Sequence, residues 1–146
     1  MKRSEIPDVA KLREEHARLI EILGRLEAAL ARSVPPPATM LFTLRLELTS
    51  ALVGHLKTED WMVYPGLIAS RDKQLAATAR AMAEEMGGLA SDFSAFSEAW
   101  GATEIGRDWP GYRRAATNMI GRLARRIARE NRELYPLIEA ALSKAA

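Results

Sequence analysis

The sequence has no cysteine among its 146 residues and only two histidines. Without cysteine there can be no disulfides, no thiolate metal sites and no cysteine nucleophiles. No stretch of about 18 apolar residues runs without charge, so no segment is expected to span a membrane. The N-terminal MKRSEIPDVA leads into charged residues and not into an apolar run, which argues against a signal peptide. We therefore expect a cytoplasmic protein.

The remaining composition is that of an ordinary globular protein. Hydrophobic residues make up 48% of the chain and charged residues 27%, a mixture that can bury a core and still remain soluble. The net charge is +2, too small to indicate nucleic-acid binding. The length suits a single domain, so residues 1–146 are predicted to fold as one unit.

Apolar residues recur at steps of three and four almost throughout, which predicts helices, and no segment shows the alternation of a strand. Prolines at 35–37 stop the first helix, and Tyr64-Pro65-Gly66 is expected to bend or end the second. Asp8, Ser70 or Asp72, and Asp108 are candidate N-caps, and the longest loop is expected at 100–111. The predicted fold is all-α, an antiparallel up-down-up-down four-helix bundle with helices at 8–33, 38–64, 71–99 and 109–144.

Several polar residues interrupt the apolar stripes at comparable depths along the predicted helices. Since the core of a bundle is otherwise apolar, these residues are expected to form one polar layer inside it. They are His16 on the first helix, His55 and Glu59 on the second, Glu85 beside Met82 and Met86 on the third, and Glu130 with Arg126 on the fourth.

This combination of side chains indicates a cation. Imidazole and carboxylate groups from facing helices are the ligands of non-haem iron and manganese bundles. A buried carboxylate without a counter-charge costs several kcal/mol, so Glu59 and Glu130 need a positive partner if they are buried. A metal ion would supply that charge, and so would the guanidinium of Arg126, one turn from Glu130.

Two stretches of the chain resemble each other and resemble a known family. Residues 55–65 read HLKTEDWMVYP and residues 126–136 read RIARENRELYP, so glutamate and Tyr-Pro recur at the same places. Together with Glu15-His16 on the first helix, this pattern is similar to the motifs of hemerythrin-like (HHE cation-binding) domains. The resemblance implies a helical bundle that holds a non-haem di-iron centre, used to bind oxygen, to sense oxygen or redox state, or to handle iron. Its implied ligands here are His16, His55, Glu59 and Glu130.

The chain departs from the family pattern in its second half. Arg126 stands where the family places a fourth-helix histidine, and Met82 and Met86 stand where it places third-helix histidines. The first hypothesis is therefore a domain without the usual di-iron centre or any other cofactor, a regulatory or interaction module with a possible protein partner. In it Arg126 replaces a ligand. The alternative is a sensor or iron-handling protein that binds iron or another divalent metal through His16, His55, Glu59 and Glu130.

Purely structural roles stay open for most of these residues. His16 and the His55–Glu59 pair could be core polar groups, Arg126 could reach out to water, and the two methionines could simply pack. Gly87-Gly88 indicates either close helix contact or a kink. Neither histidine has a matching serine or cysteine motif, and a phosphotransfer histidine would have to be exposed, so no enzyme is expected.

Overall fold

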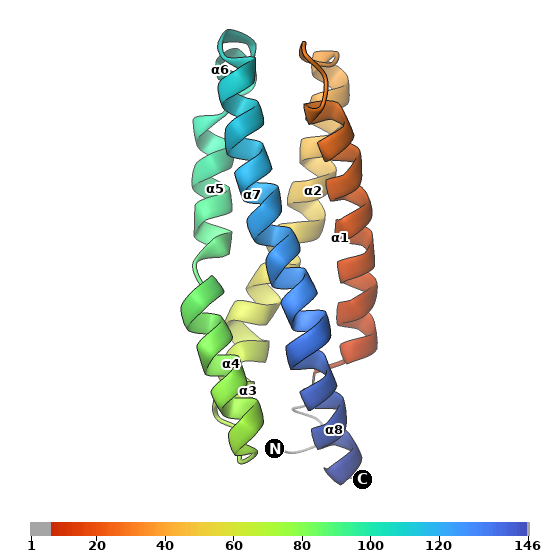
Figure 1. Ribbon diagram of the computed structural model, residues 1–146, viewed down its shortest axis with the longest axis vertical. Helices are drawn as coiled ribbons and strands as arrows, with labels where there is room; N and C mark the ends of the chain where they lie inside the picture. Colours follow the sequence, from red (N-terminus) through yellow and green to blue (C-terminus); the bar gives the residue numbers. More distant parts are fainter. Residues whose placement is uncertain (1–6, 146) are drawn as a thin grey trace.

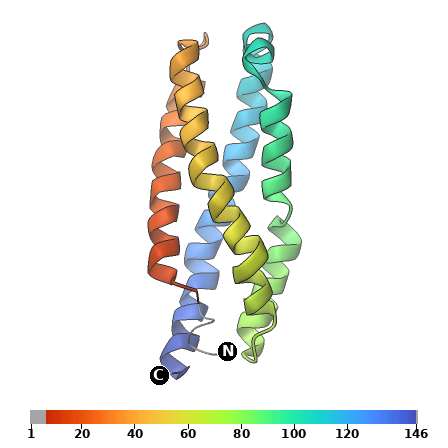
Figure 2. The same ribbon diagram turned by 180° about the vertical axis from the view of Figure 1, so that it is seen from behind.

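The computed structural model describes residues 7–145, and these residues are helical with no strand, which confirms the all-α prediction. Their helical segments run along one long axis (Figures 1 and 2). The segments outnumber the four helices predicted, because three of the four are interrupted or extended. Within the described residues, no helix combines the length and apolar character needed to cross a membrane.

The first half of the chain is a helical hairpin. Helix α1 spans Val9–Leu30 and begins where the Asp8 side chain accepts a hydrogen bond from the backbone N–H of Lys11. Helix α2 spans Ala38–Thr58 and packs against α1. Its axis continues without a break through a π-helical turn, η2, at Glu59–Val63 and a short helix, α3, at Tyr64–Ile68.

Proline explains the π-helical turn. Pro65 has no N–H, and its ring clashes with the carbonyl one α-turn earlier, so a regular α-helix cannot pass through it. The chain responds by widening one turn: the Tyr64 N–H bonds to the Glu59 carbonyl, five residues back. Of the two outcomes expected at Tyr64-Pro65-Gly66, a bend or an end, the end is wrong: the helix predicted to stop at residue 64 continues to Ile68.

The second half repeats this plan with more interruptions. The predicted third helix is split at Gly87-Gly88, where Gly88 has φ 78°, a left-handed conformation that favours glycine. The predicted loop at 100–111 contains a short helix, and Asp72 and Asp108 act as N-caps as expected. The elements are α4 (Lys73–Met86), α5 (Leu89–Ala99), α6 (Ala102–Arg107), α7 (Trp109–Arg129), the π-helical turn η3 (Glu130–Leu134) and α8 (Tyr135–Ala145).

The π-helical turn η3 has the same cause as η2. Pro136 follows Tyr135, and the Tyr135 N–H bonds to the Glu130 carbonyl. Both sequence stretches singled out above therefore begin in a regular helix and pass through a π-helical turn that starts at a glutamate.

The core consists of two apolar clusters with a polar layer between them. Along α1, Leu12 belongs to one cluster and Leu19 to the other, and His16 lies between them. Glu130 likewise separates Ile127 from Leu134. The expected single polar layer is thus present, and both apolar clusters shield it from water.

Candidate metal centre

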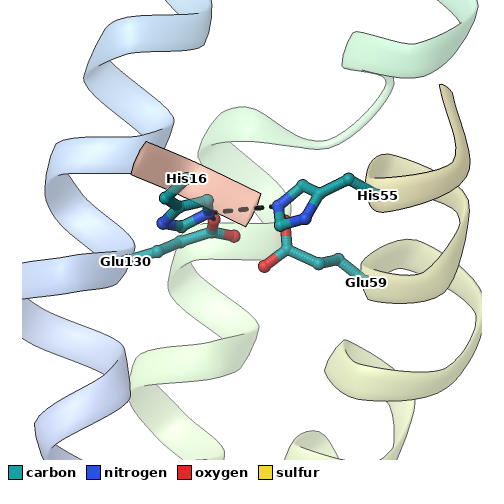
Figure 3. Close-up of side chains that lie close together, drawn as sticks. All are labelled: His16, His55, Glu59 and Glu130. Atoms are coloured by element: carbon teal, nitrogen blue, oxygen red, sulfur yellow. Dashed lines mark hydrogen bonds and ion pairs between the residues drawn. The ribbon is translucent and has the colours of Figure 1, made fainter. Parts of the chain in front are cut away.

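Four of the predicted site residues meet inside the protein. His16, His55, Glu59 and Glu130 are each at most 4% exposed, and one ligand atom from each lies within 4.8 Å of all the others. Figure 3 shows the side chains of His55 and Glu59 leaving one helix in the same direction and Glu130 reaching across from another. The i, i+4 spacing of His55 and Glu59 explains why both face the layer.

The two imidazoles point their Nε2 atoms at each other. These atoms are 3.1 Å apart, and each also faces a carboxylate oxygen: Glu130 Oε1 lies 3.1 Å from His16 Nε2, and Glu59 Oε1 lies 3.0 Å from His55 Nε2 (Figure 3). Four atoms that carry lone pairs therefore converge. Such an arrangement is repulsive unless a cation or a proton lies among them.

Acceptors on the outer side of each ring orient the imidazoles. His16 Nδ1 lies 2.8 Å from Asn131 Oδ1, and His55 Nδ1 lies 2.8 Å from Glu15 Oε1. Because both partners accept, each neutral ring carries its proton on Nδ1 and presents an unprotonated Nε2 to the layer. A carboxylate or carbonyl behind a histidine is the usual support of a metal ligand.

The two glutamates are held by tyrosines in a crossed pattern. Tyr64, in the first half of the chain, donates to Glu130 Oε2 at 2.7 Å. Tyr135, in the second half, donates to Glu59 Oε2 at 3.0 Å and also lies 3.1 Å from His16 Nε2. Each tyrosine thus fixes one oxygen of a glutamate from the other half and leaves Oε1 directed at the histidines.

Arg126 lies inside the protein and not at its surface. It is 3% exposed, and its Nε and Nη2 atoms lie 3.2 Å from Glu130 Oε2 and 3.4 Å from Glu59 Oε1. Its closest partner is Asp60, at 2.8 Å from Nη2. The predicted internal pair with the glutamates is present, and the snorkelling interpretation is wrong.

The pKa values of the layer follow from burial and from these pairs. Burial alone would lower the pKa of His55, but its hydrogen bonds to Glu59 and Glu15 and the charges of Glu59 and Glu130 raise it to about 9. Burial and then the charge of Glu130 raise the pKa of Glu59. Burial opposes ionisation of Glu130 as well, but the adjacent His16 imidazole and the charge of Arg126 lower its pKa overall. A proton on His55 can therefore balance the layer when no metal is bound.

These residues fit one divalent cation. Two imidazole nitrogens and two carboxylate oxygens suit iron, manganese or zinc. Glu130 Oε1 is buried and, with Tyr112 Oη, is one of two such side-chain atoms without a hydrogen bond in the part of the chain that the structure describes. A cation among the four atoms would satisfy it. The guanidinium that contacts both glutamates adds a positive charge but no ligand atom.

Three other predicted residues lie outside the ligand cluster. Met82 and Met86 line a pocket beside Arg126, in agreement with a place next to the layer. Glu85 does not line the layer: its side chain is 50% exposed and pairs with Arg129 and Arg125. It lies off the helix face that Met82 and Met86 share, so this prediction was wrong.

Sequence reasoning missed five residues that contact the layer: Glu15, Asp60, Tyr64, Asn131 and Tyr135. A signal was available for four of the five, because Asp60-x3-Tyr64 and Asn131-x3-Tyr135 occupy equal positions in the two similar stretches. Each of these four contacts a partner from the other half of the chain.

Comparisons with known proteins agree with this geometry. A model of the hemerythrin HHE cation-binding domain matches residues 8–138, nearly the whole chain and both similar stretches. Neither the curated proteins nor the solved structures give a match. The resemblance in the two Glu–Tyr-Pro stretches therefore reflects membership: the chain belongs to the hemerythrin HHE cation-binding domain family.

Proposed function

We propose that the domain binds one divalent cation, iron first among the candidates, and serves in oxygen or redox sensing or in iron handling. The cation would be held by His16 Nε2, His55 Nε2, Glu59 Oε1 and Glu130 Oε1. The observation that carries the proposal is the convergence of these four atoms. Hydrogen-bond acceptors face both Nδ1 atoms, so the Nε2 atoms are the ones directed at the ion.

The protein's own residues prepare the layer for such an ion. Glu15 and Asn131 keep the Nδ1 protons outward, and the tyrosines hold the far oxygens of both glutamates. The apolar clusters on either side exclude water, which strengthens every charge interaction between them. Bound iron would supply a redox-active centre with ligands from α1, from the continuous helix α2–η2 and from η3. We further propose that the helical segments of the whole domain form the up-down-up-down four-helix bundle predicted above, with the ion near its middle.

Metal titration of chelator-treated protein tests this proposal. Iron(II), manganese(II) and zinc(II) would be added anaerobically, and bound metal counted by elemental analysis, with visible absorption as the readout for iron. One equivalent is expected. At 100 times Kd it should stabilise the fold by about 2.7 kcal/mol.

Variants place the bound ion. His16→Ala and His55→Ala should abolish binding, whereas Glu85→Gln, an exposed carboxylate on the neighbouring α4, should bind as the unmodified chain does. Unchanged stoichiometry in both histidine variants would contradict the assignment.

A second candidate is a metal-free regulatory or interaction module, and Arg126 favours it. Its guanidinium, together with the proton that His55 holds up to a pKa of about 9, already balances the charges of Glu59 and Glu130. In that case the titration finds no metal, and the layer serves only to fix the helices. The stoichiometry of the unmodified protein separates the two candidates.

A further inference from the structure

We propose that Arg126, held in place by Asp60, is a fixed internal cation that limits this site to one metal ion, with Asp60 as the residue that positions the guanidinium. The inference rests on the proposed function for its first ion. It adds the reason that a layer with two buried carboxylates would not take a second ion.

The position of Arg126 is the first step. One guanidinium contacts both glutamates, and Glu59 Oε1 is shared: it lies 3.0 Å from His55 Nε2 and 3.4 Å from Arg126 Nη2. Glu130 is shared in a different way, with Oε1 facing His16 and Oε2 facing Arg126. Each carboxylate therefore faces the histidine pair and the guanidinium at once. The guanidinium supplies a positive charge beside two buried carboxylates that would otherwise need another cation.

The Arg126 side chain has space to move into a neighbouring pocket, so a contact is needed to keep it in the layer. A pocket of about 270 Å³ lies directly beside it, lined by Ile68 of α3, Met82 and Met86 of α4 and the glycines of the helix break. Three residues that line this pocket contact the guanidinium: the Met86 carbonyl accepts from Nη1 at 3.5 Å, the Tyr64 ring centre lies 5.4 Å from Cζ, and Asp60 accepts from Nη2 at 2.8 Å. Rotation of a flexible arginine side chain into this pocket would bring its charge toward solvent and empty the layer.

Asp60 prevents that movement. Its Oδ1 makes the shortest contact of the guanidinium, 2.8 Å, and the residue follows Glu59 directly in the π-helical turn. In the second half the corresponding residue is Asn131, which binds His16 instead. The carboxylate of Asp60 thus contacts an arginine across the layer, and the amide of Asn131 contacts a histidine across the layer. This match of charge to partner assigns Asp60 to holding Arg126.

Manganese(II) loading tests the inference, because bound manganese can be counted and also gives a spin resonance spectrum that changes when two ions share carboxylates. The unmodified protein should bind one ion with the spectrum of an isolated centre. Arg126→His should bind two ions, since the new imidazole joins Glu59, Glu130 and Asp60, and the spectrum should become that of a coupled pair. Asp60→Asn, at a partly exposed position that tolerates change, should admit a second ion more weakly.

Matched controls change the same groups elsewhere. Arg129→His removes an arginine of the same helix that pairs with Glu85 and Glu133. Asp92→Asn removes the partner of Arg122 at the surface. Both controls should bind one ion.

Two ions in the unmodified protein, or a single ion in Arg126→His, would overturn the inference. A single ion in Asp60→Asn would overturn the role of Asp60. Failure of the proposed function looks different, because the unmodified protein would then bind none. If Arg126→His gained ions in that case, the guanidinium would still be the group that fills the cation position. If it also bound none, both ideas would fall.

Discussion

Residues 55–65 and 126–136 start from the same pattern and perform different tasks. Both pass through a π-helical turn before Tyr-Pro, and both contribute one glutamate and one tyrosine to the layer. The first stretch begins with His55, which pairs with His16, and the second begins with Arg126, which bridges the glutamates. The backbone plan is the same in both stretches, and the differing residues at the first and sixth places, His55 against Arg126 and Asp60 against Asn131, make the chemistry asymmetric.

The difference shows that the same place in a repeated pattern can supply a positive charge with or without a ligand atom. Histidine and arginine each offer a cation to the same buried carboxylates, but only histidine can also bind a metal. Four predictions test how far the two halves differ, from the largest expected effect to the smallest.

Removal of the guanidinium should have the largest effect on the metal-free protein. Arg126→Met leaves Glu59 and Glu130 buried without it, and breaking a buried pair in this way costs about 3–5 kcal/mol. Urea unfolding would measure the loss. Arg122→Met, which breaks an exposed pair with Asp92, should cost within about 1 kcal/mol. Equal losses in the free energy of unfolding would mean that the buried Arg126 contributes no more to stability than the exposed Arg122.

The histidine half should make metal-free stability depend on pH. The pKa of His55 is about 9 in the folded protein and 6.5 in its reference state, so folding favours the protonated form. The resulting stability is fully present below pH 6.5 and is lost as pH rises through 9, a change on the order of 3 kcal/mol. Denaturation of the unmodified protein and of His55→Gln across this range would measure it. A slope that persists in His55→Gln would assign it to another group.

The crossed tyrosines test whether the halves are equivalent. Tyr64→Phe and Tyr135→Phe each remove a hydrogen bond to a buried carboxylate and should cost about 1.5–3 kcal/mol. Tyr112→Phe is the matched control, because its buried hydroxyl has no hydrogen-bond partner and its loss should be neutral or stabilising. Thermal unfolding of the three variants would rank them. A cost confined to Tyr64→Phe or to Tyr135→Phe would show that only one half depends on its tyrosine.

The smallest expected effects concern glycines in two other helices. Helix α1 of the first half is continuous, whereas the helix of the second half is broken between α4 and α5. Gly88→Ala places a side chain at φ 78° and should destabilise by about 1 kcal/mol. Gly24→Ala lies in the continuous α1, with nothing within 4 Å of the added Cβ, and should stabilise by about 0.5–1 kcal/mol. Calorimetry would give both signs. A stabilising Gly88→Ala would mean that the break at Gly87-Gly88 is not needed.

Much of the molecule could be predicted from local patterns. Three features depend on the spacing of residues within individual helices. They are the stripes of apolar residues, the caps at Asp8, Asp72 and Asp108, and the positions of the four ligand candidates. The errors arose where the outcome depended on contacts across the chain. Glu85 was assigned to the layer from its neighbours in sequence, but its position on α4 turns it toward Arg129. The continuation of the helix through Pro65 was not predicted. The π-helical turn that accommodates the proline forms only where the chain stays helical beyond it.

The sequence by itself determined the helices, the family pattern and the set of groups that must be neutralised inside the core, because periodicity and residue chemistry are local. The tertiary structure alone decided which groups neutralise one another. It joined Tyr64 to Glu130 and Tyr135 to Glu59, brought His16 to His55, and placed Arg126 against Asp60. These partners lie 39 to 76 residues apart in the chain, and only the packing of the helices brings their charges within reach.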